Sequence, residues 1–264
     1  MIIQSPELLI YKQENAKERI DKYLLLLITF KGGLAFGVKY NKRQNKPMQW
    51  LMEINNTCMI GGIGDLRDFN TTILAISNFC QGMANLIGSH YLTSSGIVNF
   101  LSGSLNKAFE ESAKALAVNF LVADWRNKEP DLCFVDFDGQ IKQLKCFAVA
   151  GGSEYSEPLD EEEIKKLPPQ EKAFLEKKRA EIASMGGDGS LMVPSKIYQP
   201  RKKAIAYLEK TWKPNMKKEE AVNLLKNTLF ECNPESHDNM VEITVIIPGK
   251  EPKPLYSEKD KNKK

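Results

Sequence analysis

The feature that most constrains the fold is an apolar hairpin near the N-terminus. Residues 23–40, YLLLLITFKGGLAFGVKY, are two apolar runs separated by a turn at Gly32 and Gly33. Two strands joined by so short a turn run antiparallel, and their apolar composition predicts a buried position. The chain therefore needs other elements to cover this hairpin.

Helices and strands follow the hairpin in separate blocks. Residues 5–23 precede it as a short helix that begins at Ser5 and Pro6, an N-cap followed by proline at the first helical position. We expect Leu8, Leu9, Ala16 and Ile20 to form the partial apolar face of that helix. Residues 48–62 predict one or two strands. Apolar residues recur every three or four positions in 64–88 and 93–113, which predicts two amphipathic helices.

The second half repeats the same order of blocks. Three strands are expected over 115–125, 131–137 and 141–152, with a hairpin turn at Asp138-Gly139. Two helices over 201–212 and 217–232 and a strand over 239–249 follow. Because strands and helices do not alternate, the order argues against a doubly wound parallel sheet. It predicts an α+β fold, a four-layer αββα sandwich of two antiparallel sheets flanked by helix pairs.

The expected domain plan has one main domain and an interruption. Residues 1–22 form an N-terminal arm and helix, 23–247 a single domain, and 248–264 a disordered basic tail. Within the main domain, 153–199 is charged and contains Pro168-Pro169. We interpret 153–199 as a surface insertion with one short charged helix.

Composition excludes several classes of function. Lys and Arg number 37 against 34 Asp and Glu, a balance too even to indicate nucleic-acid or membrane-surface binding. No apolar run approaches the roughly twenty residues that a membrane helix needs, and the N-terminus does not resemble a secretory signal. Five widely spaced cysteines and two histidines offer little for a metal site, a disulfide framework or a histidine-based triad. We expect a cytoplasmic protein without metal or cofactor.

The order of blocks, with three Gly-Gly pairs, resembles the proteasome fold, and more closely the bacterial-type 20S proteasome α-subunit. SPE opens the N-terminal helix, and NTCMIGGIGDLRDFN resembles the passage from strand to helix. FDGQIKQLKCFAVAGG resembles the hairpin that ends in Gly-Gly, and VEITVII the last strand. The resemblance extends from Ser5 to Ile247. The insertion at 153–199 departs from it.

This resemblance implies a non-catalytic chain. Catalytic members use an N-terminal threonine whose hydroxyl attacks the peptide while its own α-amine acts as base, with a lysine and an aspartate nearby. Matched through Gly33, the threonine's place falls near Tyr23, the aspartate's near Lys39, and the lysine's among Trp50, Leu51 and Met52. We therefore expect no catalytic residue. The remaining candidates are interpreted as structural or solvated side chains: Thr29, Thr57, Thr71, Thr72, Cys58, Cys80, His90 and Glu161 to Glu163.

The resemblance also implies partners. Seven copies would form a ring stacked on a ring of catalytic β-subunits, and unfolded proteins would pass through it uncut. The gate would be the N-terminal arm, which comprises Met1, Ile2, Ile3, Gln4, Ser5 and Pro6. A ring-forming AAA-type ATPase would dock its C-termini against a lysine. That lysine's place falls near Met48, and Lys46 is the nearest basic residue, with Lys42 and Arg43 in the same loop.

Two alternatives remain open at this point. One is an active N-terminal-nucleophile amidohydrolase or peptidase of the same fold that uses an unrecognised nucleophile. The other is a binding module that has lost ring assembly, with the insertion as the cause.

Overall fold

The chain folds into two compact units. The computed structural model describes residues 6–19, 24–41, 50–55, 57–112, 114–125, 130–159, 161–185, 195–232, 239–247 and 253–259. One unit, here called the body, comprises Met1–Ser153 and Pro200–Lys264, and the other, here called the insertion, comprises Glu154–Gln199.

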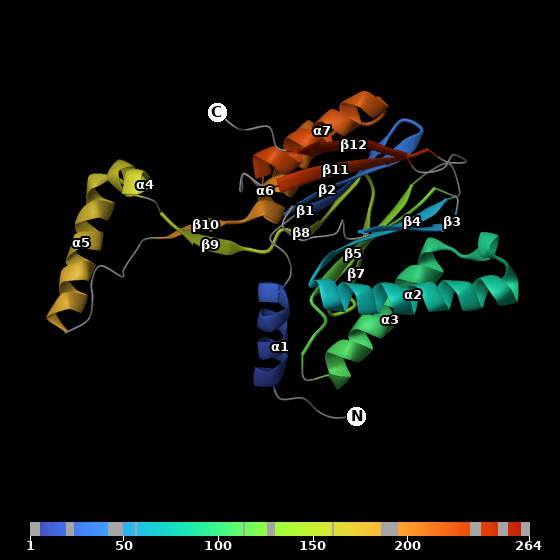
Figure 1. Ribbon diagram of the computed structural model, residues 1–264, viewed down its shortest axis with the longest axis horizontal. Coiled ribbons are helices and arrows are strands. Elements are labelled where there is room, and N and C mark those ends of the chain that lie inside the picture. Colours follow the sequence, from blue (N-terminus) through green and yellow to red (C-terminus); the bar gives the residue numbers. More distant parts are fainter. Residues whose placement is uncertain are drawn as a thin grey trace. The chain divides into compact units, whose positions relative to one another are not determined.

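Two antiparallel sheets form the centre of the body (Figure 1). The first sheet has the order β12-β11-β2-β1-β8, with β1 at Leu24–Phe30, β2 at Gly33–Asn41, β8 at Phe147–Gly151, β11 at Asn239–Ile246 and β12 at Lys253–Lys259. The second has the order β3-β4-β5-β6-β7, with β3 at Leu51–Asn55, β4 at Cys58–Gly64, β5 at Val118–Asp124, β6 at Asp131–Val135 and β7 at Ile141–Leu144.

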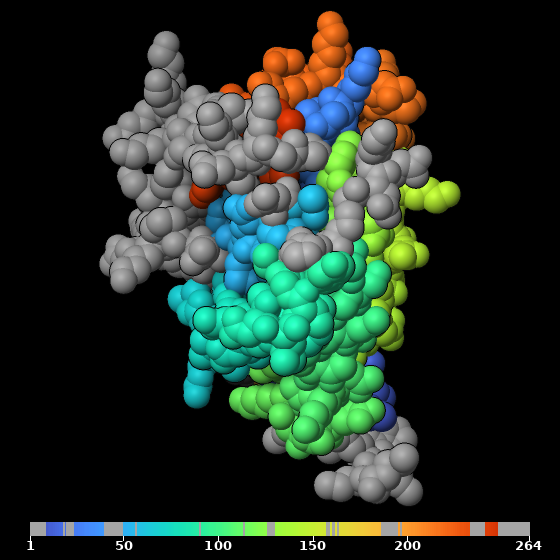
Figure 2. All heavy atoms as spheres, turned by 90° about the vertical axis from the view of Figure 1, so that its right-hand side faces the viewer, coloured from blue at the N-terminus to red at the C-terminus, as the bar shows by residue number. Residues whose placement is uncertain are grey.

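A pair of helices covers the outer face of each sheet. Helices α2 (Leu66–Ile87) and α3 (Ser94–Glu111), joined through the 3-10 turn η1 (Ser89–Tyr91), pack on the second sheet and lie side by side in Figure 2. Helices α6 (Pro200–Thr211) and α7 (Lys218–Cys232) pack on the first sheet. The predicted four-layer αββα sandwich is confirmed. A further helix of the body, α1 (Pro6–Arg19), precedes β1.

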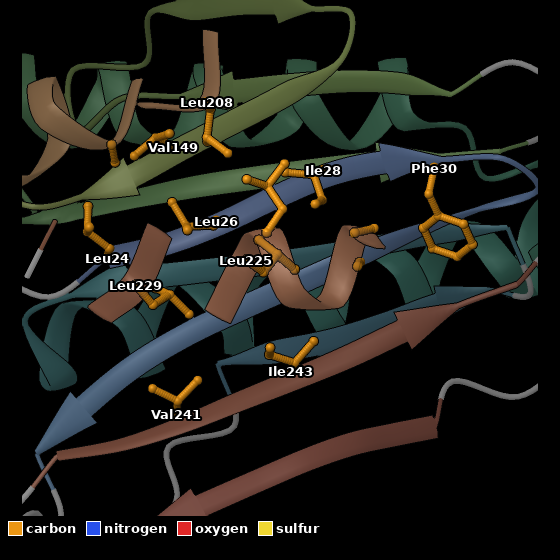
Figure 3. Packing of buried hydrophobic residues seen from close by; sticks show 14 of the residues in the cluster. Leu24, Leu26, Ile28, Phe30, Val149, Leu208, Leu225, Leu229, Val241 and Ile243 are labelled. Atoms are coloured by element: carbon orange, nitrogen blue, oxygen red, sulfur yellow. The ribbon is translucent and has the colours of Figure 1, made fainter. Parts of the chain in front are cut away.

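Strand β1 is buried on both faces because it lies between a helix layer and the other sheet. Leu24, Leu26 and Ile28 point to α6 and α7, where they meet Leu208, Leu225 and Leu229 (Figure 3). Leu25 and Leu27 alternate with them and pack in the core between the two sheets. This period of two is the geometry of a strand, and burial on both faces explains why Leu24 to Ile28 are apolar at every position.

Two predicted segments differ in the structure. Residues 141–152, expected as one strand, form β7 and β8 in different sheets, with Lys145 and Cys146 between them. The change from the exposed β7 to the buried β8 marks this crossing. Residues 248–264 were expected to be a disordered tail, yet β12 pairs along β11. Backbone hydrogen bonding at an open sheet edge requires no apolar side chains, so composition did not indicate this strand.

The insertion has its own secondary structure. Strands β9 (Tyr155–Pro158) and β10 (Ser195–Tyr198) form a two-stranded ribbon, and α4 (Glu161–Lys166) and α5 (Pro169–Ser184) lie between them in sequence. The expectation of one short charged helix was therefore wrong. Pro168 is the N-cap of α5 and Pro169 its first residue. Proline is favoured at the first position of a helix. The Pro-Pro pair therefore marks the start of α5 and separates it from α4.

Candidate functional site

The site where this fold would place a nucleophile is the start of β1. Tyr23 lies outside the described residues, and the first described residue of the strand, Leu24, is fully buried and pairs with Gly151 of β8. The register continues on the other side with Leu25 opposite Val38 of β2. Lys39 therefore lies at this same end of the first sheet.

Lys39 occupies the position predicted for an aspartate. Its side chain is only 1% exposed, and its ammonium lies 5.3 Å from the centre of the Phe230 ring of α7. A cation over an aromatic face is attracted by the ring quadrupole. The side chain thus belongs to the layer between the first sheet and α7, and it places a positive charge where a carboxylate was sought.

Trp50 occupies the position predicted for a lysine. Its indole is buried in the core between the two sheets and tilted against Phe36, with ring centres 6.4 Å apart. Nε1 donates a hydrogen bond to Oε2 of Glu242 over 3.1 Å. The next two residues, Leu51 and Met52, are half-buried. This position therefore contributes to packing and supplies no amine.

Helix α1 is attached to the rest of the body by a buried lysine. The Lys12 side chain is 1% exposed, and its ammonium donates to the carbonyl oxygens of Phe109 at 2.7 Å and Glu110 at 3.4 Å. Both carbonyls belong to the last turn of α3, where helix carbonyls lack intrahelical partners and the helix dipole favours a cation. One turn later, Ala16 is fully buried in a small cluster with Phe109, Ala115, Ala117 and Phe137.

A second basic residue attaches the end of α1 to the start of α2. The Arg19 guanidinium contacts Asp68 at 2.5 Å and Asp65 at 3.3 Å, and it donates to the carbonyl of Ala115. Asp65 is the N-cap of α2. Although burial by itself raises the pKa of Asp65, hydrogen bonds from the helix start and from Arg19 lower it overall. The helix before β1 is therefore an integral part of the body.

The face that α1 buries agrees with the expected one at Ala16 but not at Leu9. Lys12, Ala16 and Arg19 follow at helical spacing and make the contacts, whereas Leu9, predicted on the apolar face, is exposed. The side chains of Leu8 and Ile20 lie outside the described part. The helical spacing of Lys12, Ala16 and Arg19 is the feature of the sequence that could have indicated this docking face.

The hydroxyl candidates have structural roles. Thr29 is buried within β1, where its backbone pairs with Leu34. Thr71 and Thr72 donate to the carbonyls of Arg67 and Asp68 within α2. The Thr57 hydroxyl is 3.0 Å from Oδ1 of Asn55, within the turn between β3 and β4.

The thiols are poorly suited to nucleophilic attack. Burial, with a smaller contribution from Asp131, raises the pKa of Cys133 to about 11. Burial also raises the pKa of Cys232 to about 11 and raises that of Cys80. Cys58 is fully buried, and Cys80 is half-buried. Since the thiolate is the nucleophile, the three thiols with raised pKa are protonated near neutral pH.

Several predicted residues lie wholly or partly outside the described part of the chain. Lys46, its loop neighbours Lys42 and Arg43, and Met1 to Ser5 lie outside the described residues, and Pro6 is the first residue of α1. His90 belongs to η1, and its side chain is not described. Glu162 is exposed in α4.

Within the ranges that the structure describes, no group of three or more His, Cys, Asp or Glu side chains could hold a metal ion. None of the helices described is long and apolar enough to cross a membrane.

Comparison with known proteins gives the family. The family model described as "Proteasome subunit" matches residues 28–180, which is more than half of the chain. The match begins inside β1, includes all of the second sheet, and extends into α5 of the insertion. No match was found among curated proteins. By its family match and its four-layer fold, the chain belongs to the proteasome subunit family.

Proposed function

We propose that the chain is a non-catalytic, α-type subunit of a 20S-like proteasome core particle. The observation that carries the proposal is the docking of α1 through Lys12 and Arg19. An N-terminal nucleophile needs a chain that begins at β1, because its own α-amine is the base. A helix held in place immediately before β1 is the arrangement of a retained N-terminal segment.

The residues around the start of β1 support the same reading. Lys39 is a buried cation over Phe230, and Trp50 is a packed indole bonded to Glu242. Lys39 does not supply the carboxylate sought at its position, and Trp50 does not supply the amine sought at its own. The proposal therefore assigns no catalytic residue to this chain.

In this role the chain forms the outer ring of the particle and controls the passage of unfolded proteins. The ring is a heptamer with interfaces above about 1,000 Å² each, as stable contacts require, and it stacks on catalytic β-subunits. Membership of a ring-forming family supports self-association. Met1 to Pro6 are the gate, and Lys46 receives the C-termini of an AAA-type ATPase in the cytoplasm.

The proposed domain plan follows from this role. Residues 1–22 act as gate arm and docking helix, and 23–247 as one proteasome-fold domain interrupted at about 153–199. The insertion lies between β8 and α6 in sequence.

Co-expression with a proteasome β-subunit tests the proposal. We expect electron microscopy to show stacked rings, and peptide hydrolysis to require the β-subunit. Hydrolysis by the purified chain alone, lost on mutating one Thr, Ser or Cys, would establish an amidohydrolase instead. A monomeric mass, with no ring in the presence of the β-subunit, would favour a binding module.

The docking lysine has a separate test in the assembled particle. Lys46→Ala is expected to abolish ATPase-stimulated degradation while hydrolysis of short peptides persists, because a charge-assisted hydrogen bond to the incoming carboxylate is lost. Lys42→Ala in the same loop serves as the control. Unchanged stimulation in Lys46→Ala contradicts the assignment of this residue.

A further inference from the structure

The outer surface of helices α2 and α3 is free of charged side chains along most of its length. Residues 69–106 contain no Asp, Glu, Lys or Arg, although these four types make up 27% of the chain. This is the longest uncharged run in the sequence. The exposed residues of α2 and α3 within it are here called the uncharged face. The proposed function assigns no role to this surface.

Helix α2 contributes one exposed row to the uncharged face. Positions three and four apart share one side of a helix, and the exposed residues with this spacing are Asn70, Leu74, Asn78, Gln81 and Asn85. Leu74, in the middle of the row, is 63% exposed, and Leu86 near the end of the helix is 80% exposed. Large apolar side chains left in water, on a face without charges, indicate a surface that a protein covers.

Helix α3 contributes a second row beside the first. Its exposed residues with the same spacing are Ser95, Asn99, Gly103 and Asn106. The rings of Phe79 in α2 and Phe100 in α3 stack with their centres 4.2 Å apart, so the two helices form one layer (Figure 2). Asp68 precedes the uncharged run and Lys107 follows it. An uncharged centre with charged residues at its margin is the anatomy of a protein interface.

Two glycines of the uncharged face are not explained by contacts among the described residues. Gly82 lies inside α2 and Gly103 inside α3, and both are exposed. A Cβ built at either position would meet no atom within 4 Å. Glycine inside a helix is less stable than alanine, because its backbone loses more freedom on folding. The close approach of a second backbone is a condition under which glycine is preferred.

The chemistry of the uncharged face limits what can cover it. A charged surface brought onto this face would lose its water without gaining a counter-charge, which is costly. The amides of Asn and Gln each carry donors and an acceptor, so a row of them can form hydrogen bonds with an identical row. In a two-fold contact the same patch meets itself, and a charged patch would bring like charges together. The uncharged face avoids this repulsion and is complementary to a second copy of itself.

The size of the uncharged face is close to what a stable contact needs. Helices α2 and α3 have 22 and 18 residues, which makes them about 33 and about 27 Å long. With a width of about 10 Å each, they present about 600 Å² to a partner. Each partner contributes roughly 800 Å² to an interface of standard size.

We infer that the uncharged face is a self-association surface, through which two copies of this chain pair about a two-fold axis. A ring of subunits is built from heterologous contacts between two different surfaces, so this isologous contact would be additional to those of a ring. The inference applies to single chains and to rings alike, and it does not depend on the proposed function.

Native mass spectrometry of the full chain, purified without a β-subunit, tests the pairing. One copy has a mass of 29.8 kDa, and we expect the parent to contain an even number of copies. Leu74→Lys should have half the mass of the parent, because both copies then bring a like charge into the contact. Since Leu74 is mostly exposed, this substitution should change folding little.

Phe174→Lys on α5 is the matched control. The Phe174 ring is 62% exposed but lies outside the uncharged face, so this variant should keep the mass of the parent. A parent with one copy or an odd number of copies would overturn the inference, and so would a Leu74→Lys variant with the parent mass. If the chain alone is unpaired and Leu74→Lys prevents capture of a β-subunit, the face binds that subunit and not a second copy.

Replacing Gly82 and Gly103 together by alanine distinguishes pairing from folding. In the Leu74→Lys background, where pairs are absent, the two alanines should raise the Tm by about 1–4 °C, because alanine favours the helix. In the parent background they should raise the concentration at which half of the pairs dissociate by about tenfold or more, since the added methyl groups hold the two backbones apart. A purely structural role of the glycines does not produce these opposite effects. Pairing as strong as in the parent would overturn the inference.

Discussion

Helices α7 of the body and α5 of the insertion are nearly equal in length but differ in what stabilises them. In the 15 residues of α7, Ala221, Leu224, Leu225, Thr228, Leu229 and Cys232 are buried. In the 16 residues of α5, only Leu175 is buried. The contacts of α5 include the exposed pair Lys178–Glu181 and a bond from Lys172 to a carbonyl of α4. Since helix stability in proteins comes mainly from packing, α7 depends on tertiary structure and α5 on local contacts.

The largest expected effect is in the core under α7. Leu225→Ala removes a fully buried side chain that packs between β1 and α7 (Figure 3). We expect the free energy of unfolding to fall by about 2–5 kcal/mol, because a cavity remains where the side chain was. Urea unfolding measures this. Phe174→Ala on α5, where the ring is 62% exposed, should change stability by less than about 0.5 kcal/mol. Equal losses of unfolding free energy in Leu225→Ala and Phe174→Ala would contradict the difference between α7 and α5.

Helix α1 is an intermediate case, since it docks mainly through charged groups. Lys12→Met removes the ammonium that bonds the carbonyls of Phe109 and Glu110. We expect a loss of about 1.5–3 kcal/mol, as for hydrogen bonds to a charged group, and faster exchange throughout α1. Lys17→Met, at an exposed position of the same helix, is the control. If both variants exchange alike, Lys12 does not hold α1.

A smaller effect is expected from the N-cap of α2. The pKa of Asp65 is lowered from 3.8, so its carboxylate favours the folded state above that value, and this contribution is lost as the pH falls through the folded pKa. Asp65→Asn keeps the capping oxygen but removes the charge. Its unfolding free energy should therefore depend less on pH below pH 3.8 than that of the parent. Parallel curves for the two proteins would show that the charge of Asp65 contributes nothing.

The smallest effect is expected when the insertion is removed. Strands β9 and β10 pair Tyr155 with Tyr198, so the two ends of the insertion lie one strand spacing apart. Joining Ser153 to Pro200 through two glycines should shift the unfolding free energy of the body by about 1 kcal/mol or less, since closing a loop depends weakly on its length. Calorimetry and the near-ultraviolet spectrum check this. A deletion variant that does not fold would show that the insertion is part of the core.

Local sequence signals predicted much of the fold. The turn at Gly32 has φ +87°, a value that glycine readily adopts, and it joins β1 and β2 as expected. The apolar stripes of α2 and α3 face the second sheet through Phe69, Ile76, Ile97 and Leu101. These elements were predictable because residues two apart share a face of a strand, and residues three or four apart share a face of a helix.

The candidate site was predictable only in part. The residues that the resemblance points to at the aspartate and lysine positions, Lys39 and Trp50, could be named from the sequence. That the ammonium of Lys39 lies over Phe230, in a helix about 190 residues later in the sequence, follows from packing and from no local pattern. Lys12 was likewise missed, because its acceptors lie 97 and 98 residues away in α3.

The sequence by itself thus determined the order of most strands and helices of the body, the apolar faces that pair them, and the identity of the residues, Lys39 and Trp50, at the positions that the resemblance points to. The tertiary structure alone decided which sheet β7 and β8 join, which face of α1 docks, and how the start of α6 meets Gly152. The reason is that a local pattern records how a segment buries apolar surface. Buried charges and sheet edges instead find partners that are distant in the chain, and only the folded structure brings those partners together.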